Sequence, residues 1–232
     1  MSAIVYRPSC LERVDLHHQR LSDKSCVVSA LDDDRKTIKT YLYHAALKQG
    51  LTEQTKVTAL ADGAHNCWSV ILALKPHCQI LKCILDWFHI AQKFQHVNQA
   101  LAGTFVEAVE RAQWTLWHAD AAAALKKIAF IRDNITAEKN RSQLERLHDY
   151  LENNIDYLVN YDQRHKANLV FTTQGAESHI DSLINARHKR KQKMQWTREG
   201  AHNVLQIRAS MSAQEWKEKW LELVLPQKEK AA

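Results

Sequence analysis

Short apolar runs alternate with longer amphipathic segments through the first hundred residues. Apolar positions recur at helical spacing in residues 34–49 and 65–74, and a further helix is expected from about Phe88. Four β-branched or apolar runs end at polar residues, which predicts strands at residues 2–6, 25–31, 56–61 and 79–85. Strands that alternate with helices are typical of a layered α/β domain. We therefore assign residues 1–100 to an α/β core.

The pattern changes after Leu101. No strand pattern occurs up to about His165, and leucines and isoleucines recur every three or four positions, at Leu144, Leu147, Leu151, Ile155 and Leu158. That spacing packs one helix against another. We expect an all-helical insertion over residues 101–165, a return to the core over 166–225, and a disordered tail at 226–232.

Composition agrees with this organisation. The chain has 232 residues, of which 45% are hydrophobic, with five glycines and three prolines. Scarce Gly and Pro favour a helix-rich α/β fold. The five cysteines form no CxxC pair, so we expect no disulfides and a reduced, cytoplasmic setting. No apolar run reaches membrane-spanning length, and the first residues lack the pattern of a signal peptide.

Positive charge is concentrated near the end of the chain. Between Lys166 and Arg208 there are eight Lys or Arg residues against three Asp or Glu residues. A local excess of this kind suggests a polyanionic partner. On charge alone, a solvated helix face is an equally valid interpretation.

Three acidic residues occupy positions where chemistry is plausible. Asp62 and Asp86 each follow a predicted strand, and Glu177 lies in the first turn of a helix predicted over residues 175–192. Carboxylates at strand ends project into the crevice where α/β folds bind ligands. Taken one at a time, each of them is explained better as a turn aspartate or as a glutamate at a helix N-terminus.

Oxygen ligands of this kind suit Mg²⁺ or Mn²⁺. Two such ions roughly 4 Å apart activate a hydroxyl and stabilise the leaving oxygen in phosphoryl transfer. Zinc is not expected, because the spacing of the nearby histidines and cysteines fits no common zinc pattern: Cys67, His77, Cys78, Cys83 and His89.

Two sequence blocks resemble the ISKra group of bacterial insertion-sequence transposases, which is related to the Mutator-type and other DDE transposases. The first block is LADGAHNCW followed by ILDWFHIAQKFQ, and the second is GAESHIDSLINARHKRKQKMQWTREGAHNVLQIRA. The resemblance spans about residues 25 to 216, and its two ends are more specific than its helical middle.

The resemblance implies a ribonuclease H-like core with a helical insertion before the last catalytic acid. It implies that Asp62 is the second catalytic aspartate and Glu177 the catalytic glutamate, both as metal ligands. Asp86 and His89 would support the site. The group carries its first catalytic aspartate on the first strand of the sheet, and no acid of this chain matches that position. We therefore expect a ribonuclease H-like core that lacks its first strand.

The basic residues of the second block are expected to contact DNA phosphates, which positions DNA without reading its sequence. They are Arg187, Lys189, Arg190, Lys191, Lys193, Arg198 and Arg208.

These patterns predict an N-terminally truncated transposase that binds DNA but is inactive alone. Its expected partners are transposon ends, target DNA, and a second copy or a full-length transposase. No association with a membrane is expected. Two alternatives remain open. One is a non-catalytic DNA- or partner-binding regulator of a full-length transposase, and the other is an enzyme whose first aspartate another chain supplies.

Overall fold

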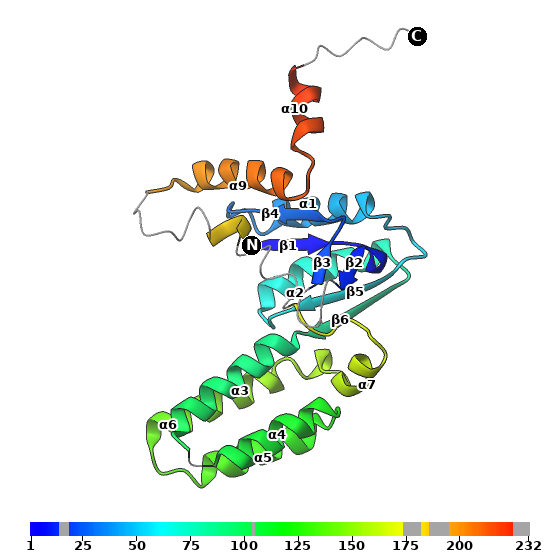
Figure 1. Cartoon of the computed structure of the whole chain (residues 1–232). Helices are drawn as coiled ribbons and strands as arrows, with labels where there is room; N and C mark the ends of the chain where they lie inside the picture. Colours follow the sequence, from blue (N-terminus) through cyan, green and yellow to red (C-terminus); the bar gives the residue numbers. More distant parts are fainter. Residues whose placement is uncertain (14–18, 104, 174–181, 186–194, 225–232) are drawn as a thin grey trace. The chain divides into compact units, whose positions relative to one another are not determined.

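The computed structural model describes residues 1–13, 19–103, 105–173, 182–185 and 195–224 and shows a helix-rich α/β protein (Figure 1). Its contacts divide the chain into two compact units. The first comprises Met1–Thr55, Ser69–Ile80 and Gln174–Ala232, and the second comprises Lys56–Trp68 and Leu81–Thr173. Neither unit is continuous in the sequence.

The first unit is built on an antiparallel strand pair. Strand β1 (Ser2–Val5) pairs with β4 (Ser25–Val28), with Ala3 opposite Val27. A second antiparallel pair precedes β4, formed by β2 (Leu11–Arg13) and β3 (Gln19–Leu21) after the short helix η1 (Pro8–Cys10). Helix α1 (Lys36–Lys48) packs on β1 and β4 through its apolar face of Ile38, Leu42, Ala45 and Ala46.

The end of the chain completes this unit. Helix α9 (Arg198–Ser212) packs on β4 and is followed by α10 (Trp216–Val224). Leu205 and Ala209 of α9 join Val28 and Leu183 in one buried cluster. The Gln206 side chain also donates a 2.7 Å hydrogen bond to the carbonyl of Val28, so α9 contributes both apolar and polar contacts to the strand.

The second unit contains the strand pair β5 (Lys56–Ala61) and β6 (Ile80–Leu85). The Gln79 N–H donates to the Thr55 carbonyl, and the Asp86 N–H donates to the Ala61 carbonyl. The bonded positions advance together along both strands, so the strands run parallel. Helix α2 (His65–Ile71) begins in this unit after β5 and continues into η2 (Leu72–His77) of the first unit.

A block of helices forms the rest of the second unit and is visible at the bottom of Figure 1. Contacts join α3 to α4, α4 to α5, α5 to α6, and α6 back to α3. The core between them consists of fully buried apolar side chains, including Phe94, Leu116, Ile128 and Leu144. The elements are α3 (Trp87–Leu101), α4 (Val106–Trp117), α5 (Ala121–Asp133), α6 (Glu138–Glu152), η3 (Ile155–Tyr157) and α7 (Tyr161–Lys166).

The structure confirms the helix-rich α/β class and the helical character of the segment after Leu101. The four predicted strands are present, although three are shorter than predicted because Tyr6, residues 29–31 and Gln79 lie outside the strands. The predicted leucine seam holds through Leu151 and ends there, since Ile155 is 45% exposed in η3. Strands β2 and β3 and helix α9 were not predicted from the apolar spacing.

The helix predicted over residues 175–192 lies outside the described residues except for the helical segment 182–185. Within the described part of the chain, the structure has no helix that combines the length and the apolar character needed to cross a membrane. The proposed domain limits at residues 100 and 165 stay a prediction.

Candidate functional site at the ends of β5 and β6

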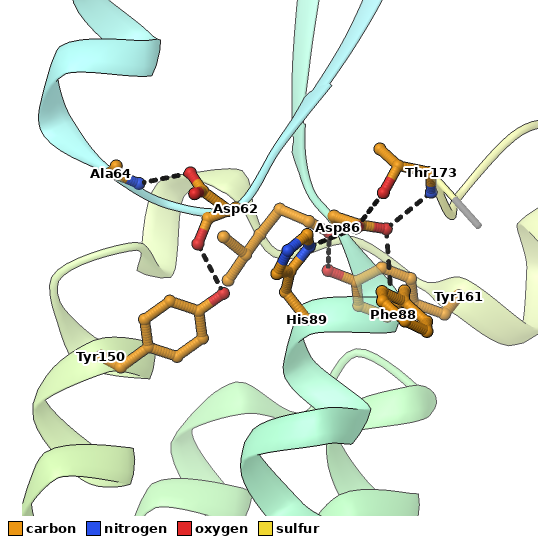
Figure 2. Close-up of polar contacts among 9 residues, drawn as sticks. Asp62, Ala64, Asp86, Phe88, His89, Tyr150, Tyr161 and Thr173 are labelled. Carbon is orange, nitrogen blue, oxygen red and sulfur yellow. Dashed lines mark hydrogen bonds and ion pairs between the residues drawn. The ribbon is translucent and has the colours of Figure 1, made fainter. Parts of the chain in front are cut away.

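Asp62 and Asp86 directly follow β5 and β6, and the strand pair brings their main chains together. The Asp86 N–H donates a 2.9 Å hydrogen bond to the carbonyl of Ala61, the residue before Asp62. The side chains then diverge: in Figure 2 the Asp62 carboxylate points towards Ala64, whereas the Asp86 carboxylate points towards Thr173. The two aspartates are therefore neighbours in the fold, but each has its own polar environment.

Asp62 presents an exposed carboxylate on a tight turn. One carboxylate oxygen accepts a 3.0 Å hydrogen bond from the Ala64 N–H, which stabilises the turn that leads into α2. The Cys67 thiol, one helical turn further on, is affected by this charge. Burial, together with the charge and hydrogen bonding of Asp62, raises the pKa of Cys67 to about 11.

Gly63 fits tightly between neighbouring elements. Its φ of +92° lies in the left-handed region that side chains with a Cβ disfavour. A Cβ added here would lie 2.9 Å from side-chain atoms of Leu85, Tyr150 and Asn154. Both the conformation and the available space therefore require glycine after Asp62.

The end of α6 holds the Asp62–Gly63 turn in place. The Tyr150 hydroxyl donates a 2.9 Å hydrogen bond to the carbonyl of Asp62 (Figure 2). Burial raises the pKa of Tyr150, and the charges of Asp62 and Asp86 raise it further, so the hydroxyl remains protonated and keeps donating. The Lys93 ammonium lies 4.2 Å from the centre of the Tyr150 ring, which adds a cation–π contact.

A second bridge joins this turn to the helical block. The Trp68 indole N–H donates a 2.9 Å hydrogen bond to the Asn154 side chain, whose amide nitrogen donates to the Tyr150 carbonyl. Trp68 also stacks on Tyr157, with ring centres 4.1 Å apart. The Asp62 turn is consequently positioned by residues that follow it by almost ninety positions.

Asp86 is fully buried and caps the N-terminus of α3. One carboxylate oxygen accepts from the Phe88 N–H at 3.2 Å and the Thr173 N–H at 2.9 Å, and the other accepts from His89 Nδ1 at 2.6 Å and from the Thr173 hydroxyl. A carboxylate has about four lone-pair positions, and all are used here.

The charge of Asp86 is stabilised by these contacts. Burial acts to raise the pKa of Asp86, but the hydrogen bonds from His89, Thr173 and Phe88 outweigh it and hold the pKa below its usual range. The neighbouring Tyr161 hydroxyl donates a 2.8 Å hydrogen bond to the Leu85 carbonyl, which fixes the end of β6. Asp86 therefore organises the start of α3 and orients His89.

The described acids do not form a magnesium site by themselves. Asp86 has no lone pair left for a cation, and the third predicted acid, Glu177, lies outside the described residues. Asp62 is the one predicted metal ligand that lies within the described residues, and it is exposed. A single carboxylate does not hold Mg²⁺ or Mn²⁺ firmly, so we derive no catalytic step through a metal.

A separate group of possible ligands occurs on α6. The side chains of His148, Asp149 and Glu152 have ligand atoms within 4.8 Å of one another. The two acids are exposed, and neighbouring charges on a helix surface often cluster in this way. We assign no metal to this group.

The predicted DNA-contacting residues are only partly described. Arg198 is exposed at the start of α9 and forms a 2.6 Å ion pair with Asp32. Arg208 donates to the main-chain carbonyls of Leu183 and Ser182, so its guanidinium holds the helical segment 182–185 against α9. The other five lie outside the described residues: Arg187, Lys189, Arg190, Lys191 and Lys193.

Sequence reasoning missed the partners of both aspartates. Thr173, Tyr150 and Asn154 are distant in the sequence and belong to no recognisable motif. Thr172 and Thr173 precede the second of the two sequence blocks, which starts at residue 175, and this position was the one hint in the sequence. The residues around Tyr150 in the sequence do not indicate which carbonyl its hydroxyl contacts.

Comparison with known proteins gives a match to one family model. The model describes an uncharacterised protein family, UPF0236, and it matches residues 53–222. This range begins before β5, includes Asp62 and Asp86, and ends within α10. Neither the curated proteins nor the solved structures gave a match.

Proposed function

We propose that this chain, which belongs to the uncharacterised protein family UPF0236, is a DNA-binding protein of DDE transposase descent with a ribonuclease H-like core. The reaction that this descent implies is divalent-metal-dependent cleavage and transfer of DNA strands. We propose further that the chain is inactive alone, because its sequence supplies two of the three acids that such chemistry uses.

The placement of Asp62 carries this proposal. Its carboxylate is exposed at the carboxyl end of β5, beside the end of the parallel strand β6. Ligands of open α/β sheets bind at this edge. Tyr150 and Gly63 hold the turn rigidly, as a ligand of a reactive centre requires.

In a completed site, Asp62 and Glu177 would hold Mg²⁺ or Mn²⁺ together with an aspartate from another chain. Bound metal would supply activation of a water or a 3′-hydroxyl and stabilisation of the leaving oxygen. The buried Asp86 and its partner His89 would keep the start of α3 in position beside Asp62.

Strand β5 offers a place for a further strand. Among the described residues, β5 pairs with β6 alone. The carbonyls of Thr55 and Ala61 accept hydrogen bonds from the β6 side, so the backbone groups of the odd-numbered residues of β5 face β6. The backbone groups of Thr58 and Leu60 therefore face the opposite edge. A parallel strand added there would end beside Asp62, so an aspartate supplied by another chain would complete the site.

A regulator of a full-length transposase is the second candidate function. It is favoured by the four hydrogen bonds to the Asp86 carboxylate, which leave no lone pair for a metal ion. Of the two aspartates that follow β5 and β6, Asp62 alone is then exposed to bind one. Such a regulator would bind DNA or a transposase subunit without cleaving DNA.

Two measurements on the full chain test the proposed function. The first is titration with duplex DNA over a range of salt concentrations. We expect weak sequence preference and an affinity that falls steeply with salt, because phosphate contacts release counterions. The absence of binding at low salt would reject the proposed DNA-binding function and would leave only a regulator that binds a transposase subunit.

The second measurement is strand transfer after mixing with a polypeptide that supplies a strand ending in an aspartate. We expect no Mg²⁺- or Mn²⁺-dependent nicking by the chain alone, and Asp62→Ala to abolish any activity of the mixture while leaving DNA affinity unchanged. Asp149→Ala, an exposed acid on α6, is the matched control. Robust nicking by the chain alone that is lost in Glu177→Ala would contradict the proposal that the chain is inactive alone.

A further inference from the structure

We infer that an aromatic pocket on the helical block binds the arginine side chain of a basic segment in a partner protein. The pocket is lined by Trp87, Glu110, Gln113, Trp114 and Trp117 and encloses about 290 Å³. This volume lies at the lower limit of the sites that hold drug-sized ligands and is large enough for one arginine side chain. The inference is independent of the proposed function.

The three tryptophans provide ring faces at several angles. Trp87 and Trp117 lie 4.7 Å apart at an interplanar angle of 64°, and Trp114 and Trp117 lie 6.2 Å apart at 82°. Trp117 also contacts the rings of Tyr161 and Phe171, with ring centres 6.0 Å and 5.5 Å away. Trp114 is 61% exposed, which is unusual for so large an apolar side chain. The packing holds two rings in place and leaves the third accessible.

Polar groups of the pocket favour a cation. Glu110 is exposed one helical turn before Trp114, and it forms no ion pair with any described residue, whereas Glu107 on the same helix is paired with Arg111. The Gln113 side chain adds an amide oxygen. Indole faces attract cations, and a carboxylate beside them strengthens the attraction.

Arginine fits this combination better than lysine does. Its planar guanidinium stacks on an indole while its N–H groups donate to a carboxylate and an amide oxygen. Nucleic acid fits less well, because the Glu110 charge repels phosphates and the described lining contains no Lys or Arg to contact them.

Fluorescence titration of the full chain tests the inference. The probe is acetyl-Gly-Arg-Gly-amide, and its neutral counterpart carries citrulline in place of arginine. We expect the arginine peptide to quench tryptophan emission and to bind at least tenfold more tightly than the citrulline peptide. Equal binding of the two peptides would overturn the inference.

Variants locate the binding site. Glu110→Gln and Trp114→Ala should each weaken arginine binding about tenfold, whereas the matched controls Glu107→Gln and Phe130→Ala should leave it unchanged. Phe130 is a suitable control because it is 65% exposed on the adjacent helix α5. Trp114 is exposed too, so circular dichroism should show its variant to be folded.

Competition with a single-stranded oligonucleotide distinguishes the other occupant. If the oligonucleotide displaces the arginine peptide and binds more tightly, and Trp114→Ala removes that binding, the pocket is a nucleobase site and the inference is wrong. If the oligonucleotide does not displace the peptide, assignment to a basic protein segment is supported.

Discussion

The Thr173 N–H donates a 2.9 Å hydrogen bond to the buried Asp86 carboxylate, although the two residues are 87 positions apart. The Thr173 hydroxyl donates to the same carboxylate. These contacts join the end of β6 to the segment that follows α7 and precedes residues 174–181. Asp86 thereby joins the start of the helical block at Trp87 to the segment that follows Lys166.

Replacing Asp86 should destabilise the second unit. Asp86→Ala removes the buried acceptor that the donors of Phe88, His89 and Thr173 share, and each such loss costs about 1–3 kcal/mol. We expect a loss of about 3 kcal/mol in the free energy of unfolding, measured in urea. Asp62→Ala is the control and should cost about 0.5–1.5 kcal/mol, because that carboxylate is exposed and accepts one hydrogen bond, from the Ala64 N–H. Equal effects of the two substitutions would contradict the role assigned to Asp86.

The stability that Asp86 contributes should depend on pH in the acid range. The pKa of Asp86 in the folded protein is lower than the ordinary value of about 3.9. Its contribution is therefore fully present above pH about 4 and is lost as the pH falls through the folded pKa. Urea unfolding at pH 7 and pH 3 should show a larger acid loss for the wild type than for Asp86→Asn. An identical loss in both proteins would rule out this linkage.

Gly63 should be far less tolerant of substitution than another glycine with a similar backbone. Gly63→Ala combines the strain of a positive φ with contacts of 2.9 Å to three side chains, which together cost about 3 kcal/mol. Gly103 has a φ of +95° but no neighbour within 4 Å of an added Cβ, so Gly103→Ala should cost about 1 kcal/mol. Thermal unfolding of both variants makes the comparison. Similar melting temperatures would mean that the turn can relax away from Tyr150 and Leu85.

Cys67 should report the charge of Asp62. With its pKa raised to about 11, the Cys67 thiol reacts slowly at pH 8, because its thiolate fraction is roughly 100-fold lower than that of an ordinary thiol. Asp62→Asn removes the negative charge and should accelerate alkylation of Cys67 by iodoacetamide. Peptide mapping by mass spectrometry gives the rate, and Asp149→Asn serves as the control. An unchanged rate in Asp62→Asn would place the cause in burial alone.

Local sequence was sufficient to predict most of the elements. The runs that became β5 and β6 are apolar and end at aspartates, so strand and turn could be predicted from adjacent residues. Helix α9 escaped notice because its buried positions include His202 and Ser210, which do not look apolar. Strands β2 and β3 have three residues each, too few to show a period of two.

The sequence by itself determined where Asp62, Asp86 and Gly63 stand, since each follows from a strand end or a turn. Only the tertiary structure decided that the two carboxylates serve different purposes. Burial and four donors engage Asp86, whereas Asp62 stays exposed on a turn that Tyr150 holds. The physical reason is that hydrogen-bond donors reach a carboxylate through space. Asp62 accepts from Ala64, its neighbour in the chain. Asp86 accepts from Thr173, which only the fold brings near.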